Sequence, residues 1–200
     1  MVSFCSALSV KPLLNRLWSP TYPFGATTLT VDEATTVAAW AVKTAWMREL
    51  TSGGRITPSQ EMRTYLMTNL IPPAFTRVWI GLHRGRIDFH ARLMRVQASH
   101  KDDEWNTDRF RDVTFCLHTF KGLSVLVRTD SDWGVPEANF PERHWRQLWP
   151  LTETVPWPPS QTLTDTDVAT ALIRFSEWLR MPTIDKFRRD PNGIQRRRRN

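Results

Sequence analysis

The chain has 200 residues and carries 27 lysines and arginines against 20 aspartates and glutamates, a formal net charge of +7 at pH 7. Its hydrophobic content of 40% and aromatic content of 11% exclude a chain that is disordered throughout. Two cysteines exclude a disulfide scaffold, and no apolar run is long enough to span a membrane. These bounds predict a cytoplasmic protein with reduced thiols and no membrane partner.

The first predicted elements are two helices. Leucines and a tryptophan recur at near-helical spacing over residues 9–18, which predicts a short helix. A longer helix is expected after Thr30, because Thr30 and Glu33 have the spacing of a capping box. Its apolar residues recur at helical spacing as far as Trp46, and Gly53-Gly54 is expected to end it.

A third helix is predicted before residue 72. Thr57 is its expected N-cap and Pro58 its first residue, since proline is favoured at that position. Pro72-Pro73 is expected to terminate it. The residues expected to form its one apolar face are Met62, Tyr65, Leu66 and Leu70.

From residue 77 onward the pattern changes to that of strands. Short runs rich in β-branched and aromatic residues predict an antiparallel sheet of about four strands. Arg84-Gly85-Arg86 and Lys121-Gly122 are predicted to be the tight turns of two hairpins. The predicted strands cover residues 77–82, 88–96, 112–120 and 123–128.

Residues 130–163 have little periodicity and contain many prolines and tryptophans. This segment is predicted to wrap over the core, with a short strand around residues 147–149. A last helix is expected over residues 164–180, capped by Thr164. The sequence therefore predicts one α+β domain over residues 1–180, in which N-terminal helices and a C-terminal helix pack on the sheet.

The positive charge is concentrated at the C-terminus. Residues 181–200 carry a net charge of +5, which leaves only +2 for the rest of the chain. Because this segment has few apolar residues, it is predicted to be a disordered tail. A block of like charge contacts phosphates or serves only as a solubilising terminus. The tail arginines predicted to bind nucleic acid are Arg188, Arg189, Arg196, Arg197, Arg198 and Arg199.

Several short sequence segments within residues 9–180 resemble segments of one group of bacterial and phage proteins. These segments are Ala39-Trp40-Ala41-Val42-Lys43-Thr44-Ala45, Ile71-Pro72-Pro73, Arg77-Val78-Trp79-Ile80-Gly81, Leu148-Trp149-Pro150 and Val155-Pro156-Trp157-Pro158-Pro159. In that group they follow a Cys-x-x-Cys-Asn motif, and the upstream part of those proteins is similar to HNH endonucleases.

The chain departs from this family at the part that carries the chemistry. An HNH site needs a general-base histidine and metal ligands, often with cysteine pairs that hold zinc. In this chain Cys5 is the only cysteine that precedes the first of these segments. The resemblance therefore implies a nuclease part that is missing, is encoded upstream or is supplied by another chain. It favours a non-catalytic, HNH-associated module with no cofactor.

Two groups of residues are candidate metal ligands. His83 and His90 flank the predicted Arg84–Arg86 turn, with Asp88 between them, so a hairpin would let them converge. The alternative interpretation is three exposed hairpin residues. A polar loop group offers carboxylates for Mg²⁺ or is simply solvated. Its members are His100, Asp102, Asp103 and Glu104.

Two further features bear on partners. Arg84 and Arg86, near Arg77, are predicted to form a second phosphate-contacting spot with the tail. The tryptophans of residues 133–159 are interpreted mainly as core residues. The alternative functions are a phage or mobile-element factor that binds a protein through residues 133–159, and a metal-dependent nuclease with a cryptic site.

Overall fold

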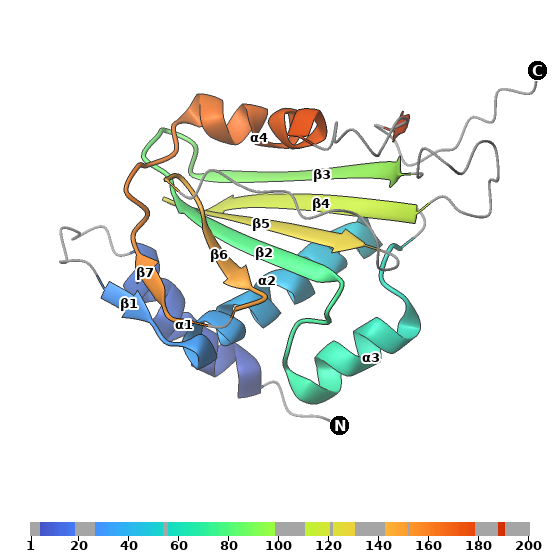
Figure 1. The fold of residues 1–200 in the computed structure, drawn as a ribbon, viewed down its shortest axis with the longest axis horizontal. Helices are drawn as coiled ribbons and strands as arrows, with labels where there is room; N and C mark the ends of the chain where they lie inside the picture. The colour runs from blue at the N-terminus through green and yellow to red at the C-terminus, as the bar shows by residue number, and fades with distance from the viewer. Residues whose placement is uncertain are drawn as a thin grey trace, which may run out of the picture.

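The computed structural model describes residues 5–18, 27–53, 56–98, 111–120, 122–130, 143–151, 153–178 and 188–190. The fold is α+β, as predicted (Figure 1). In chain order its elements are α1 (Cys5–Trp18), β1 (Thr27–Leu29), α2 (Val31–Thr51), α3 (Gln60–Asn69), β2 (Thr76–Leu82), β3 (Phe89–Ala98), β4 (Arg111–Phe120), β5 (Leu123–Asp130), β6 (Arg146–Trp149), β7 (Val155–Trp157), α4 (Asp165–Trp178) and β8 (Arg188–Asp190).

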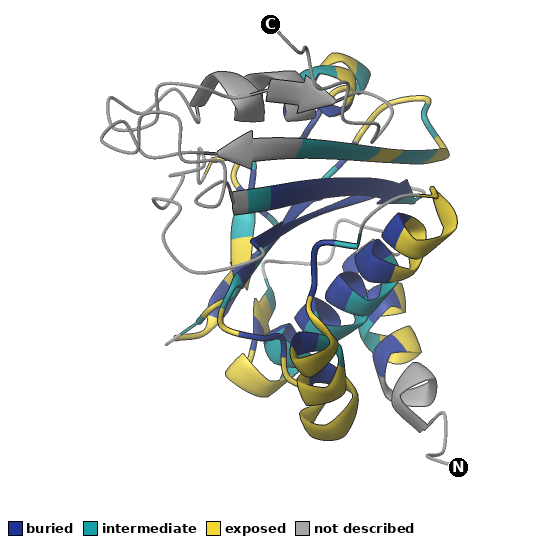
Figure 2. Cartoon of the chain, turned by 90° about the vertical axis from the view of Figure 1, so that its right-hand side faces the viewer, coloured by how far each residue is buried: buried dark blue, intermediate teal, exposed yellow. Residues whose placement is uncertain are grey.

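The described strands form a main antiparallel sheet in the order β6-β2-β5-β4-β3-β8. β1 and β7 pair separately as a second, two-stranded sheet. The four predicted strands correspond to β2 to β5, and β6 and β8 extend the sheet beyond the predicted number. Figure 2 shows that the buried residues lie mainly on the central strands and on the side of α2 that faces them.

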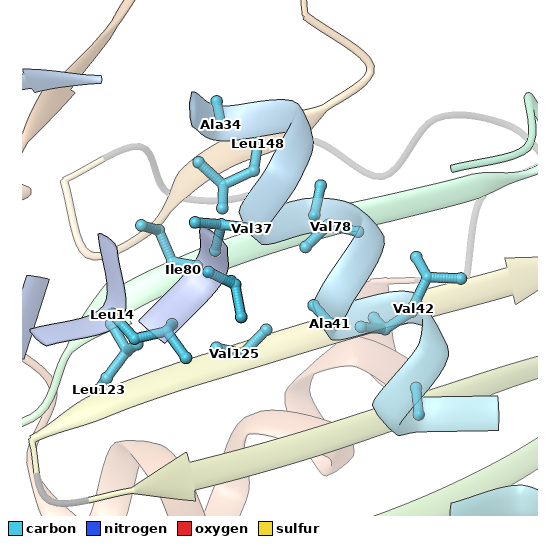
Figure 3. Close-up of a cluster of buried hydrophobic side chains, with 14 of the residues drawn as sticks. Leu14, Ala34, Val37, Ala41, Val42, Val78, Ile80, Leu123, Val125 and Leu148 are labelled. Carbon is cyan, nitrogen blue, oxygen red and sulfur yellow. The ribbon is translucent and has the colours of Figure 1, made fainter. Parts of the chain in front are cut away.

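The sheet has an apolar core on each face. On one face, residues of α1 and α2 pack against alternate residues of β2 and β5, including Val78, Ile80 and Val125 (Figure 3). On the other face, Val168 and Ala171 of α4 pack with Phe115 and other buried residues. Because side chains alternate across a strand, the two cores share the same strands. Within the described helices, none is long and apolar enough to cross a membrane.

The long helix α2 begins as the sequence predicts. Thr30 Oγ1 accepts a hydrogen bond from the Glu33 amide at 3.2 Å, and Glu33 Oε2 accepts one from the Thr30 amide at 2.9 Å. These bonds satisfy two amides that have no partner within the helix. The capping box is therefore confirmed, and α2 ends next to Gly53 as expected.

The predicted start of α3 is wrong by two residues. The N-cap is Ser59, whose hydroxyl accepts from the Met62 amide, and not Thr57. Thr57 is buried, and its hydroxyl donates to the Glu49 carboxylate instead. Of the four residues assigned to one apolar face, Met62 and Leu66 are buried, whereas Tyr65 and Leu70 are exposed.

One of the two predicted hairpins is confirmed and the other is wrong. β4 and β5 meet at Phe120 and Leu123, and Gly122 occupies the left-handed region with φ +99°. β2, by contrast, pairs with β5 and β6, so β5 and β4 lie between β2 and β3. Arg84–Arg86 therefore belongs to a crossing loop, because the seven residues of β2 find their partners farther along the chain.

The proline-rich segment after β5 is described from residue 143 on. Its predicted strand is β6, whereas β7 was not predicted from the sequence. Trp145 and Trp157 are buried, which confirms their interpretation as core residues; Trp133 lies outside the described residues. Within residues 181–200 the structure describes only β8, which pairs with β3 where the sequence analysis expects a disordered tail.

Candidate nucleic-acid interface

The loop between β2 and β3 presents two exposed arginines, Arg84 and Arg86. Asp165, the first residue of α4, holds the backbone of this loop. Its Oδ2 accepts a hydrogen bond from the Arg86 amide at 3.0 Å, and its Oδ1 accepts one from the Ile87 amide at 3.2 Å. The two arginines thus project from a backbone that is fixed to a helix terminus.

His83 completes this arrangement from the buried side. Its imidazole is buried, and Nε2 lies 2.8 Å from Asp165 Oδ1. The loop backbone is also tied to Leu163, because the Arg84 amide donates to the Leu163 carbonyl at 2.9 Å and the Leu163 amide donates to the Leu82 carbonyl at 2.7 Å. These bonds join the start of the loop to the chain that leads into α4.

The carboxylate of Asp165 is held in its charged form. Hydrogen bonding from the Arg86 amide lowers the pKa of Asp165, and the Ile87 amide and His83 act in the same direction. Hydrogen bonds to a carboxylate stabilise the ionised state. Asp165 therefore remains an acceptor for the loop amides across neutral pH.

Gly85 lies in close contact with this acceptor. A Cβ at Gly85 would overlap Asp165 Oδ1 and would lie 2.5 Å from His83 Nε2. A side chain at this position would therefore displace the Asp165 carboxylate from its hydrogen bonds with the loop amides or shift the loop itself. The close approach explains why a glycine stands between the two arginines.

We expect Gly85→Ala to lower the free energy of unfolding by about 1–3 kcal/mol, because the added Cβ displaces the Asp165 carboxylate from the Arg86 and Ile87 amides. Arg86→Ala is the matched control, since it removes an exposed side chain and keeps the backbone hydrogen bond. Denaturant unfolding of both variants measures the difference. Equal stability of the two variants would show that the loop is not held in this way.

β3, which lies between β4 and the short strand β8, carries further arginines. Arg92 is exposed, and its Nη1 donates to the Ala169 carbonyl of α4 at 2.7 Å. β8 places the backbones of Arg188 and Arg189 opposite Gln97 and Val96 of β3. Arg196 to Arg199 lie outside the described residues.

Other arginines are engaged within the protein. Arg128 is buried and donates from Nε and Nη2 to the two carboxylate oxygens of Asp130, at 2.8 and 2.7 Å. Arg95 Nε lies 3.4 Å from Glu49 Oε1. The predicted pair Arg84 and Arg86, together with Arg92, is therefore better placed for a polyanion than these two residues.

The sequence analysis missed the buried carboxylate of Glu49. Glu49 Oε1 accepts from the Thr57 amide at 2.9 Å, from Thr57 Oγ1 at 2.7 Å and from Thr114 Oγ1 at 3.1 Å. Glu49 occupies the stripe of α2 that also holds Ala45 and Trp46. An acidic residue on an apolar stripe was the signal that could have revealed this cluster.

The predicted metal ligands do not come together. Among the described residues, no group of three histidine, cysteine, aspartate or glutamate side chains could hold a metal ion. His83 binds Asp165, whereas His90 lies on β3 opposite Thr119. The hairpin that was expected to bring His83 and His90 together does not form; the His100 group lies outside the described residues.

Cys116 is a free, buried thiol and lies beside a buried imidazole. Its Sγ is 3.0 Å from His118 Nε2. Burial raises the pKa of Cys116 to about 12, and burial lowers the pKa of His118 to about 4. Both groups are therefore neutral at pH 7, so the thiolate needed for nucleophilic attack is not available.

The protein therefore has an α+β fold, and the loop between β2 and β3 carries two exposed arginines, Arg84 and Arg86. No family model, curated protein or solved structure matches the chain. The resemblance to HNH-associated proteins therefore stays a prediction.

Proposed function

We propose that the protein is a non-catalytic module that contacts nucleic acid weakly through Arg84, Arg86 and its C-terminal arginines. The observation that carries this proposal is the attachment of the Arg84–Arg86 loop to Asp165. A fixed backbone with two exposed guanidinium groups supports phosphate binding, because less conformational entropy is lost when the groups bind.

The position of β8 gives further support. Arg188 and Arg189 pair through their backbones with β3, the strand that follows the Arg84–Arg86 loop. From Phe89 to Arg95 the strand spans about 20 Å, at about 3.3 Å per residue. The loop therefore precedes one end of β3 and the backbone of Arg188 and Arg189 lies at the other end, and we propose that one nucleic-acid strand contacts both.

The charge distribution makes this contact sensitive to salt. Residues 181–200 carry a net charge of +5, and the remainder of the chain carries +2. Because binding to phosphates releases counterions, affinity falls as the salt concentration rises. We propose that any nuclease chemistry belongs to a separate HNH part, as the resemblance implies.

Substitution of the arginines by alanine tests the proposal in the full-length chain. We expect a variant in which Arg196, Arg197, Arg198 and Arg199 are all replaced to bind a labelled oligonucleotide at least about tenfold more weakly at low salt. We expect R84A/R86A to weaken binding by a smaller factor, and the combination to remove most of it. Fluorescence anisotropy with single- and double-stranded oligonucleotides measures the affinities.

The double variant K11A/R16A is the matched control for R84A/R86A. Lys11 and Arg16 are exposed on α1, and their loss removes the same charge from another part of the molecule. Binding should be nearly unchanged in this control. The proposal is wrong if the loop and tail variants bind the oligonucleotides as tightly as the wild-type chain.

A further inference from the structure

Among the described residues, strands cover only part of the outer edge of β3. β3 pairs with β4 along its whole length, from Phe89 to Ala98, in one continuous register. On its other side, β8 pairs only with Arg95 to Gln97. Within the ranges that the structure describes, no strand lies against the outer side of residues 89–94. Such an edge presents unpaired backbone donors and acceptors to an incoming strand.

Side-chain exposure agrees with an open edge. All eight residues of β5 are buried, whereas none of residues 89–95 on β3 is buried. Phe89 is 67% exposed, although its ring lies 5.7 Å from that of Phe120. Proteins protect edge strands with prolines, bulges or charged side chains, and residues 89–94 contain no proline, no bulge and one arginine, Arg92.

The two faces of this edge differ in chemistry. Phe89, Ala91 and Leu93 lie on the face that carries α2, where Leu93 packs against the first core. The opposite face carries His90, Arg92 and Met94. A strand added beside β3 would therefore meet apolar side chains on one face and the exposed Arg92 on the other.

We propose that residues 89–94 of β3 bind an extended segment of a protein partner, in which β-branched apolar residues alternate with acidic residues. The backbone of that segment adds a strand to the sheet. Its apolar residues lie beside Phe89, Ala91 and Leu93, and its acidic residues lie beside Arg92. The exposed Arg84 and Arg86 in the preceding loop extend the positive charge at this end of the edge.

Charge and sequence favour such a partner over the protein's own chain. The residue after β8 is Pro191, which has no amide hydrogen to donate to an adjacent strand. The rest of the C-terminal segment is basic, as is the edge itself. A second copy of β3 would bring its own Arg92 to the same edge. An acidic strand offers the complementary charge.

The test uses the full-length protein and a fluorescent peptide of alternating valine and glutamate. We expect the peptide to protect amide hydrogens within residues 89–94 from exchange with solvent. We expect R92E to weaken peptide binding about fivefold and to favour the corresponding valine–lysine peptide. The same valine–glutamate peptide with alternate amides methylated cannot form the strand, so it should not bind.

The peptide control separates strand addition from attraction between charges. Equal binding of the methylated and unmethylated peptides overturns the proposal, as does protection confined to another strand. An absence of binding at about 1 mM peptide also overturns it. Oligonucleotide affinity is measured separately on the same chain, so failure of strand addition is distinguishable from failure of the nucleic-acid proposal.

Discussion

Replacing Glu49 by alanine is expected to lower the free energy of unfolding by about 3–5 kcal/mol. Glu49 is only 1% exposed. Its carboxylate accepts hydrogen bonds from Thr57 and Thr114 and forms an ion pair with Arg95. Removal of the carboxylate leaves these donors without their acceptor in the interior, and an unpaired buried polar group is costly.

Chemical denaturation of Glu49→Ala measures this effect. Glu153→Ala is the control, because Glu153 is exposed, and its replacement should change the free energy of unfolding by less than about 0.5 kcal/mol. Glu49→Gln should fall between the two, since the amide keeps one acceptor oxygen but loses the charge. A loss below about 1 kcal/mol for Glu49→Ala would contradict a structural role for this carboxylate.

We also expect His118 to make the folded protein less stable as the pH is lowered. Burial lowers the pKa of His118 from 6.5 to about 4 in the folded protein. Between these pH values the unfolded chain binds a proton and the folded protein does not. Stability is therefore lost as the pH falls from 6.5 to 4. The full difference amounts to about 3 kcal/mol.

Comparison of the wild-type protein with His118→Gln isolates this contribution. The substitution removes the titrating group, so the stability of the variant relative to wild type should improve as the pH is lowered through this window. Unfolding measured at several values between pH 4 and pH 8 provides the curve. A constant difference between the two proteins across that range would show that His118 is not buried in its neutral form.

Local sequence patterns correctly predicted where two helices, α2 and α4, begin. The Thr30 and Glu33 pattern forms the capping box of α2, and Thr164 likewise exchanges hydrogen bonds with Asp167 at the start of α4. Both devices depend on residues three apart, so the sequence contains all the information. The prediction for the start of α3 was wrong because Thr57, the expected N-cap, donates its hydroxyl to Glu49, eight residues earlier in the chain.

The arrangement of strands was harder to predict, because it depends on pairings between distant parts of the chain. The sequence indicated β2 and β3 as neighbours joined by a hairpin, yet two strands lie between them. The candidate site likewise depends on contacts between distant parts of the chain. Arg84 and Arg86 could be named from the sequence, but Asp165, which holds their loop, lies about 80 positions later in the chain.

The salt dependence of oligonucleotide binding tests the central claim most directly. Each arginine that contacts a phosphate should contribute about one unit to the slope of log affinity against log salt concentration. We predict that R84A/R86A reduces this slope by about two units and that K11A/R16A leaves it unchanged. A wild-type slope near zero, or the same slope in all three proteins, would contradict a nucleic-acid interface at this loop.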